Sequence, residues 1–213
     1  MTIDKVNTLK NRDVLVESLR YPIALPKKTI LSIDEDTAVI VEQDGYFKGR
    51  WFYPFKGGTT IPLNKVAPDL KGSFLFGKYK NVTMHFLNRK GFEVHKQVQA
   101  KSATGAICTF SGTIYFSVKK LDIRKLQKWI KDNNFKTNGT TLLSVSQMKN
   151  VVSNLLFEKG FQYIVGGKRV STSNSTFKMD KLNSGYTFIE IADYIKSNCD
   201  RFGFECVCMV TPD

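Results

Sequence analysis

Residues 29–63 constrain the fold of this chain more than any other stretch of its sequence. The segment Thr37–Gln43 is rich in β-branched side chains, which favour strands. Asp44 and Gly45 follow it, and this dipeptide is typical of a two-residue type I′ turn, in which both central residues need a positive φ. The sequence therefore predicts a hairpin whose return strand is Tyr46–Trp51.

Further strands are predicted in the first half of the chain. Residues 13–21 form one candidate, and residues 82–87 and 92–98 are expected to pair as a second hairpin across a four-residue turn. The longest candidate covers residues 107–118, where apolar side chains alternate with Thr, Ser and Tyr. Such alternation predicts one buried face and one face open to solvent or to a partner.

The second half of the chain carries helical patterns. In residues 122–133, apolar side chains recur at i, i+3 and i+7. A capping box at Ser144 and Gln147 opens a second amphipathic helix, and a third is expected over residues 187–202. Residues 204–211 form a final strand. This order, strands first and helices later, predicts an α+β fold.

We therefore expect one domain over residues 13–213, preceded by a flexible start over residues 1–12. Its β-rich part, with antiparallel hairpins, would cover residues 13–118. Its helical part, with two to three amphipathic helices and the final strand, would cover residues 119–213.

Several segments, in this order along the chain, carry a resemblance to a known family. They are residues 15–22 (LVESLRYP), Ile30–Ile33, residues 37–41 with Gly45, residues 55–58 (FKGG) with 60–62, Val82–Asn88, and residues 188–210. The pattern resembles the SPFH domain of stomatin, prohibitin and flotillin, and within that family the virion-core-like branch of bacteria and phages.

The resemblance implies an SPFH-like fold and a non-enzymatic scaffold or adaptor. Such a protein would self-associate and attach peripherally to the cytoplasmic face of a membrane. The long coiled-coil segment and the membrane hairpin or lipid anchor of many SPFH proteins have no counterpart in this sequence. The resemblance therefore does not extend to cage-like assembly or to tight membrane anchoring.

The charge balance favours polyanionic partners. The chain has 32 Lys and Arg against 19 Asp and Glu, a formal net charge of +13. Nucleic acid, an anionic membrane surface and an acidic protein all fit this excess, and a merely solubilising lysine surface is the alternative. No signal peptide and no spanning apolar run is evident, so we expect a cytoplasmic protein, at most peripheral on the inner membrane face.

Two stretches are candidate contact surfaces. The predicted helix at residues 122–133 and its approach carry the basic residues Lys120, Arg124, Lys128 and Lys131. They suit anionic lipid or nucleic acid, and the alternative is the solvated face of a core helix. The loop at residues 64–81 carries the apolar Phe74, Leu75 and Phe76 between Lys71 and Lys78. It is predicted to contact a membrane or a partner.

Other clusters have simpler interpretations. Trp51, Phe52, Tyr53 and Phe55 suit either a membrane interface or, as we favour, the core. His85 and His95 would lie nearly opposite in the second hairpin, and with Glu93 adjacent they could serve a metal or acid–base role. No third metal ligand accompanies them, so we favour two polar residues on the wet face of the hairpin. Cys199, Cys206 and Cys208 lack the spacing of a zinc site and are interpreted as buried packing residues.

Three function classes remain open. The first is the SPFH-like scaffold, in which the chain itself is a partner in a homo-oligomer. The second is a basic nucleic-acid-binding protein, and the third is a phage-encoded host-interaction or inhibitor module that docks on an acidic protein. We expect no enzymatic activity and no metal or other cofactor, since no residue set has the spacing that chemistry demands.

Overall fold

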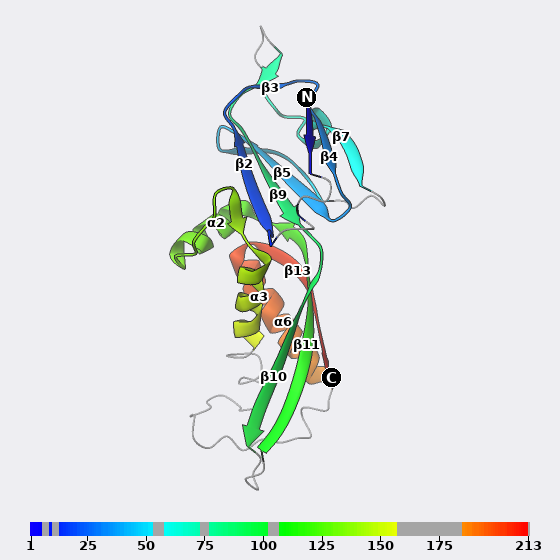
Figure 1. Ribbon diagram of the computed structural model, residues 1–213, viewed down its shortest axis with the longest axis vertical. Helices are drawn as coiled ribbons and strands as arrows, with labels where there is room; N and C mark the ends of the chain where they lie inside the picture. Colours follow the sequence, from blue (N-terminus) through cyan, green and yellow to red (C-terminus); the bar gives the residue numbers. More distant parts are fainter. Residues whose placement is uncertain are drawn as a thin grey trace. The chain divides into compact units, whose positions relative to one another are not determined.

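A computed structural model describes residues 1–5, 9, 13–52, 58–72, 77–101, 107–156 and 185–212 of the chain (Figure 1). Among these residues, strands account for 47% and helices for 27%. The chain divides into two compact units. Unit 1 comprises Met1–Lys90 and Phe135–Val145, and unit 2 comprises Gly91–Asn134 and Ser146–Asp213.

Unit 1 is built on a five-stranded antiparallel sheet with the strand order β12-β2-β9-β5-β6. The strands are β2 (Val16–Tyr21), β5 (Thr37–Gln43), β6 (Tyr46–Trp51), β9 (Val82–Asn88) and β12 (Thr141–Leu143). Nearly all side chains of β9 are buried, on both faces of the sheet. Such a strand suits the centre of a sheet, where β9 has a neighbour on each side.

The hairpin predicted around Asp44 and Gly45 is confirmed. Strands β5 and β6 pair antiparallel, with Gln43 opposite Tyr46. The φ angle is 52° at Asp44 and 80° at Gly45, as a type I′ turn requires. The register shifts just after the turn, where β6 has one residue more than β5, the mark of a β-bulge.

A second sheet of unit 1 includes the start of the chain. Strand β1 (Thr2–Asp4) pairs in parallel with β4 (Ile30–Ile33), and β4 pairs antiparallel with β7 (Thr59–Pro62). The sequence predicts a flexible start, but Thr2–Asp4 form a strand because β4 supplies the backbone partners that so short a segment cannot find locally.

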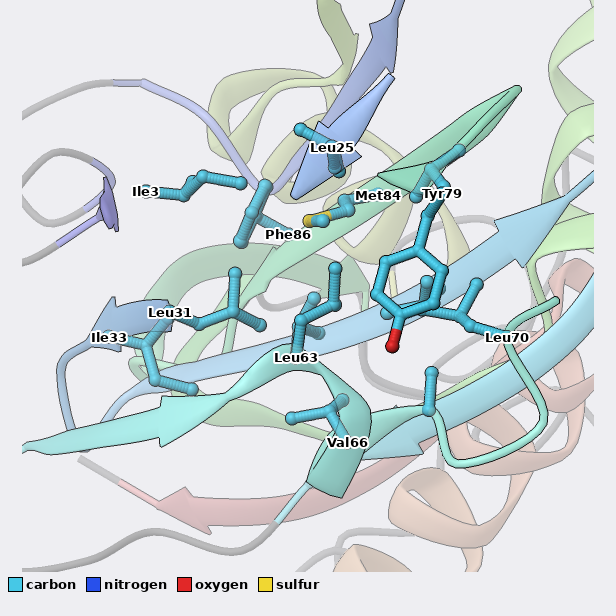
Figure 2. Packing of buried hydrophobic residues seen from close by; sticks show 14 of the residues in the cluster. Ile3, Leu25, Leu31, Ile33, Leu63, Val66, Leu70, Tyr79, Met84 and Phe86 are labelled. Carbon is cyan, nitrogen blue, oxygen red and sulfur yellow. The ribbon is translucent and has the colours of Figure 1, made fainter. Parts of the chain in front are cut away.

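The core of unit 1 is a cluster of buried apolar side chains. Figure 2 shows Met84 and Phe86 of β9 gathered with Leu31 of β4 and Leu63 of the short helix α1 (Leu63–Val66). Strand β6 passes close to the end of α1. A Cβ atom at Gly49 would lie only 2.0 Å from the carbonyl oxygen of Val66, so glycine is required there.

Unit 2 contains a three-stranded antiparallel sheet in the order β10-β11-β13. The strands are β10 (Phe92–Lys101), β11 (Ile107–Leu121) and β13 (Phe204–Pro212). The predicted alternation of β11 is confirmed in its described part. Ile114, Phe116 and Val118 are buried, whereas Tyr115 is 42% exposed.

Three helices of unit 2 lie within the described residues (Figure 1): α2 (Ile123–Asp132), α3 (Val145–Asn154) and α6 (Gly185–Phe202). The helix predicted at residues 122–133 is confirmed, since the Asp122 side chain accepts hydrogen bonds from the backbone of Arg124 and Lys125 and caps α2. As predicted, α6 ends at Gly203, where φ is 98°.

The predicted second hairpin is wrong. Strand β9 pairs with β2 and β5, and β10 pairs with β11 instead. Because β9 already has a neighbour on each side, it has no edge left for β10. His85 and His95, expected to lie nearly opposite, therefore lie in different units.

The predicted α+β class is also wrong. The fold is dominated by strands, arranged in four mostly antiparallel sheets among the described residues. Strands from the second half of the chain also return to sheets begun in the first. Strand β12 joins β2, and β13 joins β11.

Candidate binding surfaces

Three segments distant in sequence meet at one end of the five-stranded sheet of unit 1. In the register of this sheet, Val82 at the start of β9 lies opposite both Tyr21 at the end of β2 and Gln43 at the end of β5. The β2–β3 connection, the β5–β6 turn and the segment before β9 therefore lie next to one another.

Gln43 holds this end together. Its Nε2 donates to the carbonyl oxygens of Lys71 and Lys80, at 2.9 and 3.0 Å. Its Oε1 accepts from the backbone N–H of Lys71 at 2.8 Å. Gln43 is only 4% exposed, so these bonds are shielded from water and fix both ends of the segment between Lys71 and Lys80.

A small two-stranded sheet joins the β2–β3 connection to the same segment. Strand β3 (Leu25–Pro26) pairs with β8 (Lys78–Tyr79), and the backbone N–H of Lys27 donates to the carbonyl of Gly77 at 2.9 Å. The Lys27 stem runs beside Gly72, where an added Cβ would lie 2.7 Å from Lys27 Cε.

These segments form a strongly basic surface, which we name the lysine-rich end: residues 20–28, 43–48, 71–72 and 77–81. It contains seven basic residues and one acidic residue, Asp44. The basic residues are Arg20, Lys27, Lys28, Lys48, Lys71, Lys78 and Lys80; all are exposed except Lys48, which is half-buried. The Asp44 carboxylate accepts a hydrogen bond from the Asn81 amide.

Large apolar side chains protrude among these basic residues. Ile23 is 78% exposed, Tyr46 is 67% exposed and Phe47 is 41% exposed. The Lys48 ammonium lies 5.9 Å from the centre of the Tyr46 ring, within the range of a cation–π contact. Exposed rings on a basic surface suit a boundary between water and an anionic apolar phase.

The predicted loop residues Lys71 and Lys78 thus lie in the lysine-rich end, both exposed. Phe74, Leu75 and Phe76 lie outside the described residues. The predicted surfaces do not include Ile23, Tyr46 and Phe47, although two aromatic residues directly after a tight turn and next to a lysine are a usable signal in the sequence. In the aromatic stretch, Trp51 packs against the core of unit 1, as favoured, and Tyr53 and Phe55 lie outside the described residues.

The other predicted surface belongs to unit 2. Arg124, Lys128 and Lys131 are exposed on α2, while Ile123, Leu126 and Ile130 are buried on its opposite side. Lys120 is exposed too, but it lies on β11, and its ammonium pairs with the Glu205 carboxylate at 3.0 Å. Of the four predicted basic residues, three therefore lie together on the helix, and the fourth lies on the neighbouring strand in an ion pair.

A buried polar group lies on the β2-β9-β5 sheet. The Ser18 hydroxyl is 2.7 Å from Nδ1 of His85. The other ring nitrogen of His85 is 3.2 Å from the Glu42 carboxylate, but without the alignment of a hydrogen bond. His85 is only 1% exposed, so it is a buried residue of the sheet, not one on a wet face as the sequence predicts. His95 is exposed and contacts Thr113.

Three cysteines meet where α6 packs on β13. Cys199, Cys206 and Cys208 are all buried, as the packing interpretation predicts. A hydrogen bond between Cys199 and Cys206 raises the pKa of the Cys199 thiol and lowers that of Cys206. Burial raises the pKa of Cys208 to about 12. All three are packed thiols, and of these only Cys206 gains any thiolate character.

No described helix combines the length and the apolar character needed to cross a membrane. Neither a protein-family model nor a curated protein sequence matches this chain.

Proposed function

We propose that this protein binds the surface of anionic membranes through the lysine-rich end of unit 1. The observation that carries the proposal is the composition of that end. Three protruding apolar side chains, Ile23, Tyr46 and Phe47, share that end with seven basic residues and one acidic residue.

Both parts of the surface contribute to such binding. Each Lys or Arg close to an anionic leaflet contributes about 1 kcal/mol, an attraction that salt weakens. The apolar side chains add the transfer of their area from water, about 1.5–3 kcal/mol for a large side chain that becomes fully buried. Aromatic rings are favoured at the level of the headgroups. Together these terms give reversible, peripheral attachment.

The rigid base of the lysine-rich end supports the same proposal. Gln43 holds the backbone at Lys71 and Lys80, and the pairing of β3 with β8 holds it at Lys78. Because the backbone positions are held before binding, less conformational entropy is lost when the lysines meet the headgroups.

A non-enzymatic scaffold or adaptor would use such attachment, and we propose that class for the protein. Membership of the SPFH family and self-association are further proposals of the same kind. Membrane binding by the lysine-rich end does not depend on either of them, because it rests on the charge and exposure of the residues themselves.

Vesicle flotation tests the proposal. We expect the protein to float with vesicles that contain phosphatidylglycerol and to stay behind with vesicles of phosphatidylcholine alone. The variant Tyr46→Ser/Phe47→Ser keeps every charge but should lose most of the binding. The variant Lys27→Gln/Lys28→Gln keeps the rings and should require lower salt to bind.

A matched control removes the same kind of side chain elsewhere. Tyr115 and Met209 are 42% and 57% exposed on the sheet of unit 2. The variant Tyr115→Ser/Met209→Ser should bind vesicles like the unchanged protein. Equal binding to neutral and anionic vesicles, or undiminished binding by Tyr46→Ser/Phe47→Ser, would overturn the proposal.

A further inference from the structure

The exposed side of α2 carries a basic stripe in unit 2. Arg124, Lys128 and Lys131 are spaced by four and three residues, so they lie on one side of the helix. With a rise of about 1.5 Å per residue, the stripe extends roughly 10 Å along the helix axis. On the opposite side of the helix, Ile123, Leu126 and Ile130 are buried in unit 2.

Little negative charge offsets this stripe nearby in sequence. Between Lys119 and Asp132 there are six basic residues and two acidic ones, Asp122 and Asp132, of which Asp132 is exposed and lies four residues after Lys128. The Asp122 carboxylate is engaged at the start of the helix, where it accepts hydrogen bonds from two backbone N–H groups. Lys120 is paired with Glu205 and is therefore not counted in the stripe.

The stripe differs from the lysine-rich end in one decisive respect. The large apolar side chains that are exposed among the described residues include none on α2. The one aromatic residue of the helix, Trp129, is half-buried and stacks on Phe202 with ring centres 4.5 Å apart. A surface with charge but no protruding apolar side chain has little to insert into a bilayer.

We infer that α2 is a contact for the phosphate backbone of double-stranded nucleic acid. Phosphate contacts need positive charge at suitable spacing and no apolar group. Successive phosphates of one strand rise by about 3.4 Å, so the stripe spans about three of them. A single-strand binder would instead present exposed rings for base stacking, which α2 lacks.

The experiment measures binding of the full chain to a short DNA duplex over a series of salt concentrations. Three phosphate contacts predict a slope of log K against log salt of about −2.7. Each of Arg124→Gln, Lys128→Gln and Lys131→Gln should weaken the slope by about 1 and reduce affinity equally for unrelated duplex sequences. The triple variant should lose the salt-dependent binding.

Two control variants remove one positive charge each without touching the stripe. Lys120→Gln removes a lysine paired with Glu205, and Lys196→Gln removes one that lies 3.7 Å from Asp193 on α6. Both should bind the duplex nearly as well as the unchanged protein. The triple variant should also float with anionic vesicles as before, which separates this inference from the proposed function of unit 1.

Several results would overturn the inference. They are the absence of duplex binding at low salt, full binding by a folded triple variant, and a preference for single strands. A further contrary result is that Lys27→Gln/Lys28→Gln loses duplex binding while the triple variant keeps it. Circular dichroism of each variant confirms that the helix is intact.

Discussion

Asp44 and Asn81 hold each other in the left-handed backbone conformation. Each has a φ of 52°. The Asn81 side-chain amide donates to the Asp44 carboxylate at 2.7 Å, and the backbone N–H of Asp44 donates to the Asn81 carbonyl at 3.2 Å. The β5–β6 turn and the start of β9 are therefore one structural piece, and they present the lysine-rich end together.

Substitution of Asn81 separates its two contributions. Asn81→Ala loses the bond to Asp44 and also places an alanine at positive φ, which costs about 1–2 kcal/mol for most residues. Asn81→Gly loses the same bond but tolerates the backbone angle. We expect urea unfolding to show a larger loss of stability for Asn81→Ala than for Asn81→Gly. Equal losses would show that the backbone angle carries no cost.

Gln43→Ala should be among the most damaging polar substitutions in unit 1. It leaves the carbonyls of Lys71 and Lys80 and the N–H of Lys71 without their side-chain partner. We expect a loss of about 2–3 kcal/mol in the free energy of unfolding. Gln97→Ala, at an exposed position of β10, should change stability by less than about 0.5 kcal/mol. Similar effects of the two variants would contradict the role given to Gln43.

Gly49→Ala tests the close approach of β6 to α1. The new methyl group would sit 2.0 Å from the Val66 oxygen and 2.5 Å from Ala67 Cα, and both are backbone atoms that cannot rotate away. We expect a loss of about 3 kcal/mol, at the upper end for overpacking. At Gly91 the nearest atom would be 3.4 Å away, so Gly91→Ala serves as the control and should be nearly neutral in thermal unfolding.

Tyr21 should make stability depend on pH in the alkaline range. Burial, with a smaller contribution from the Glu17 charge, raises its pKa from 10.0 to about 12. The folded state thus disfavours the phenolate. The contribution of protonated Tyr21 to the free energy of unfolding is fully present below pH 10. It is lost as the pH rises toward 12, because the unfolded chain releases the proton first. Unchanged protein should lose more stability than Tyr21→Phe over this range, by at most about 2 kcal/mol, because solvent beside the half-buried ring screens part of the effect. Parallel curves for the two proteins would rule out the effect.

The cysteine cluster predicts an order of alkylation. At about pH 8 a thiol whose pKa is raised remains protonated and unreactive. In the folded protein, Cys206 should therefore react with iodoacetamide before Cys199 and Cys208, as mass mapping of peptides would show. In urea all three should react at similar rates. Early modification of Cys208 in the folded state would contradict the direction of its pKa shift.

Local patterns predicted those elements whose causes are local. Asp44 and Gly45 specify their turn because a type I′ turn depends on two adjacent residues. Helix α2 follows from the spacing of Ile123, Leu126 and Ile130 and from the cap at Asp122, all within three turns of helix. The same pattern also indicated the basic stripe, since residues on one side of a helix can be read directly from their spacing.

Pairing between distant strands did not follow from these patterns. The segment before β10 reads as a hairpin turn, but β9 is buried on both faces and takes β2 and β5 as neighbours. Short-range signals report how one strand is exposed, and they carry little information about which other strand covers its edges.

The order of residues along the chain was enough to specify the first turn, the amphipathic helices and a strongly basic protein. The tertiary structure alone decided that Ile23, Tyr46 and Phe47 stand among seven basic residues. Those residues come from segments that lie side by side because Tyr21 and Gln43 both lie opposite Val82 in the sheet. Side-chain spacing within one element is a local property, whereas a surface built from three loops depends on strand register, which the burial of the whole sheet sets.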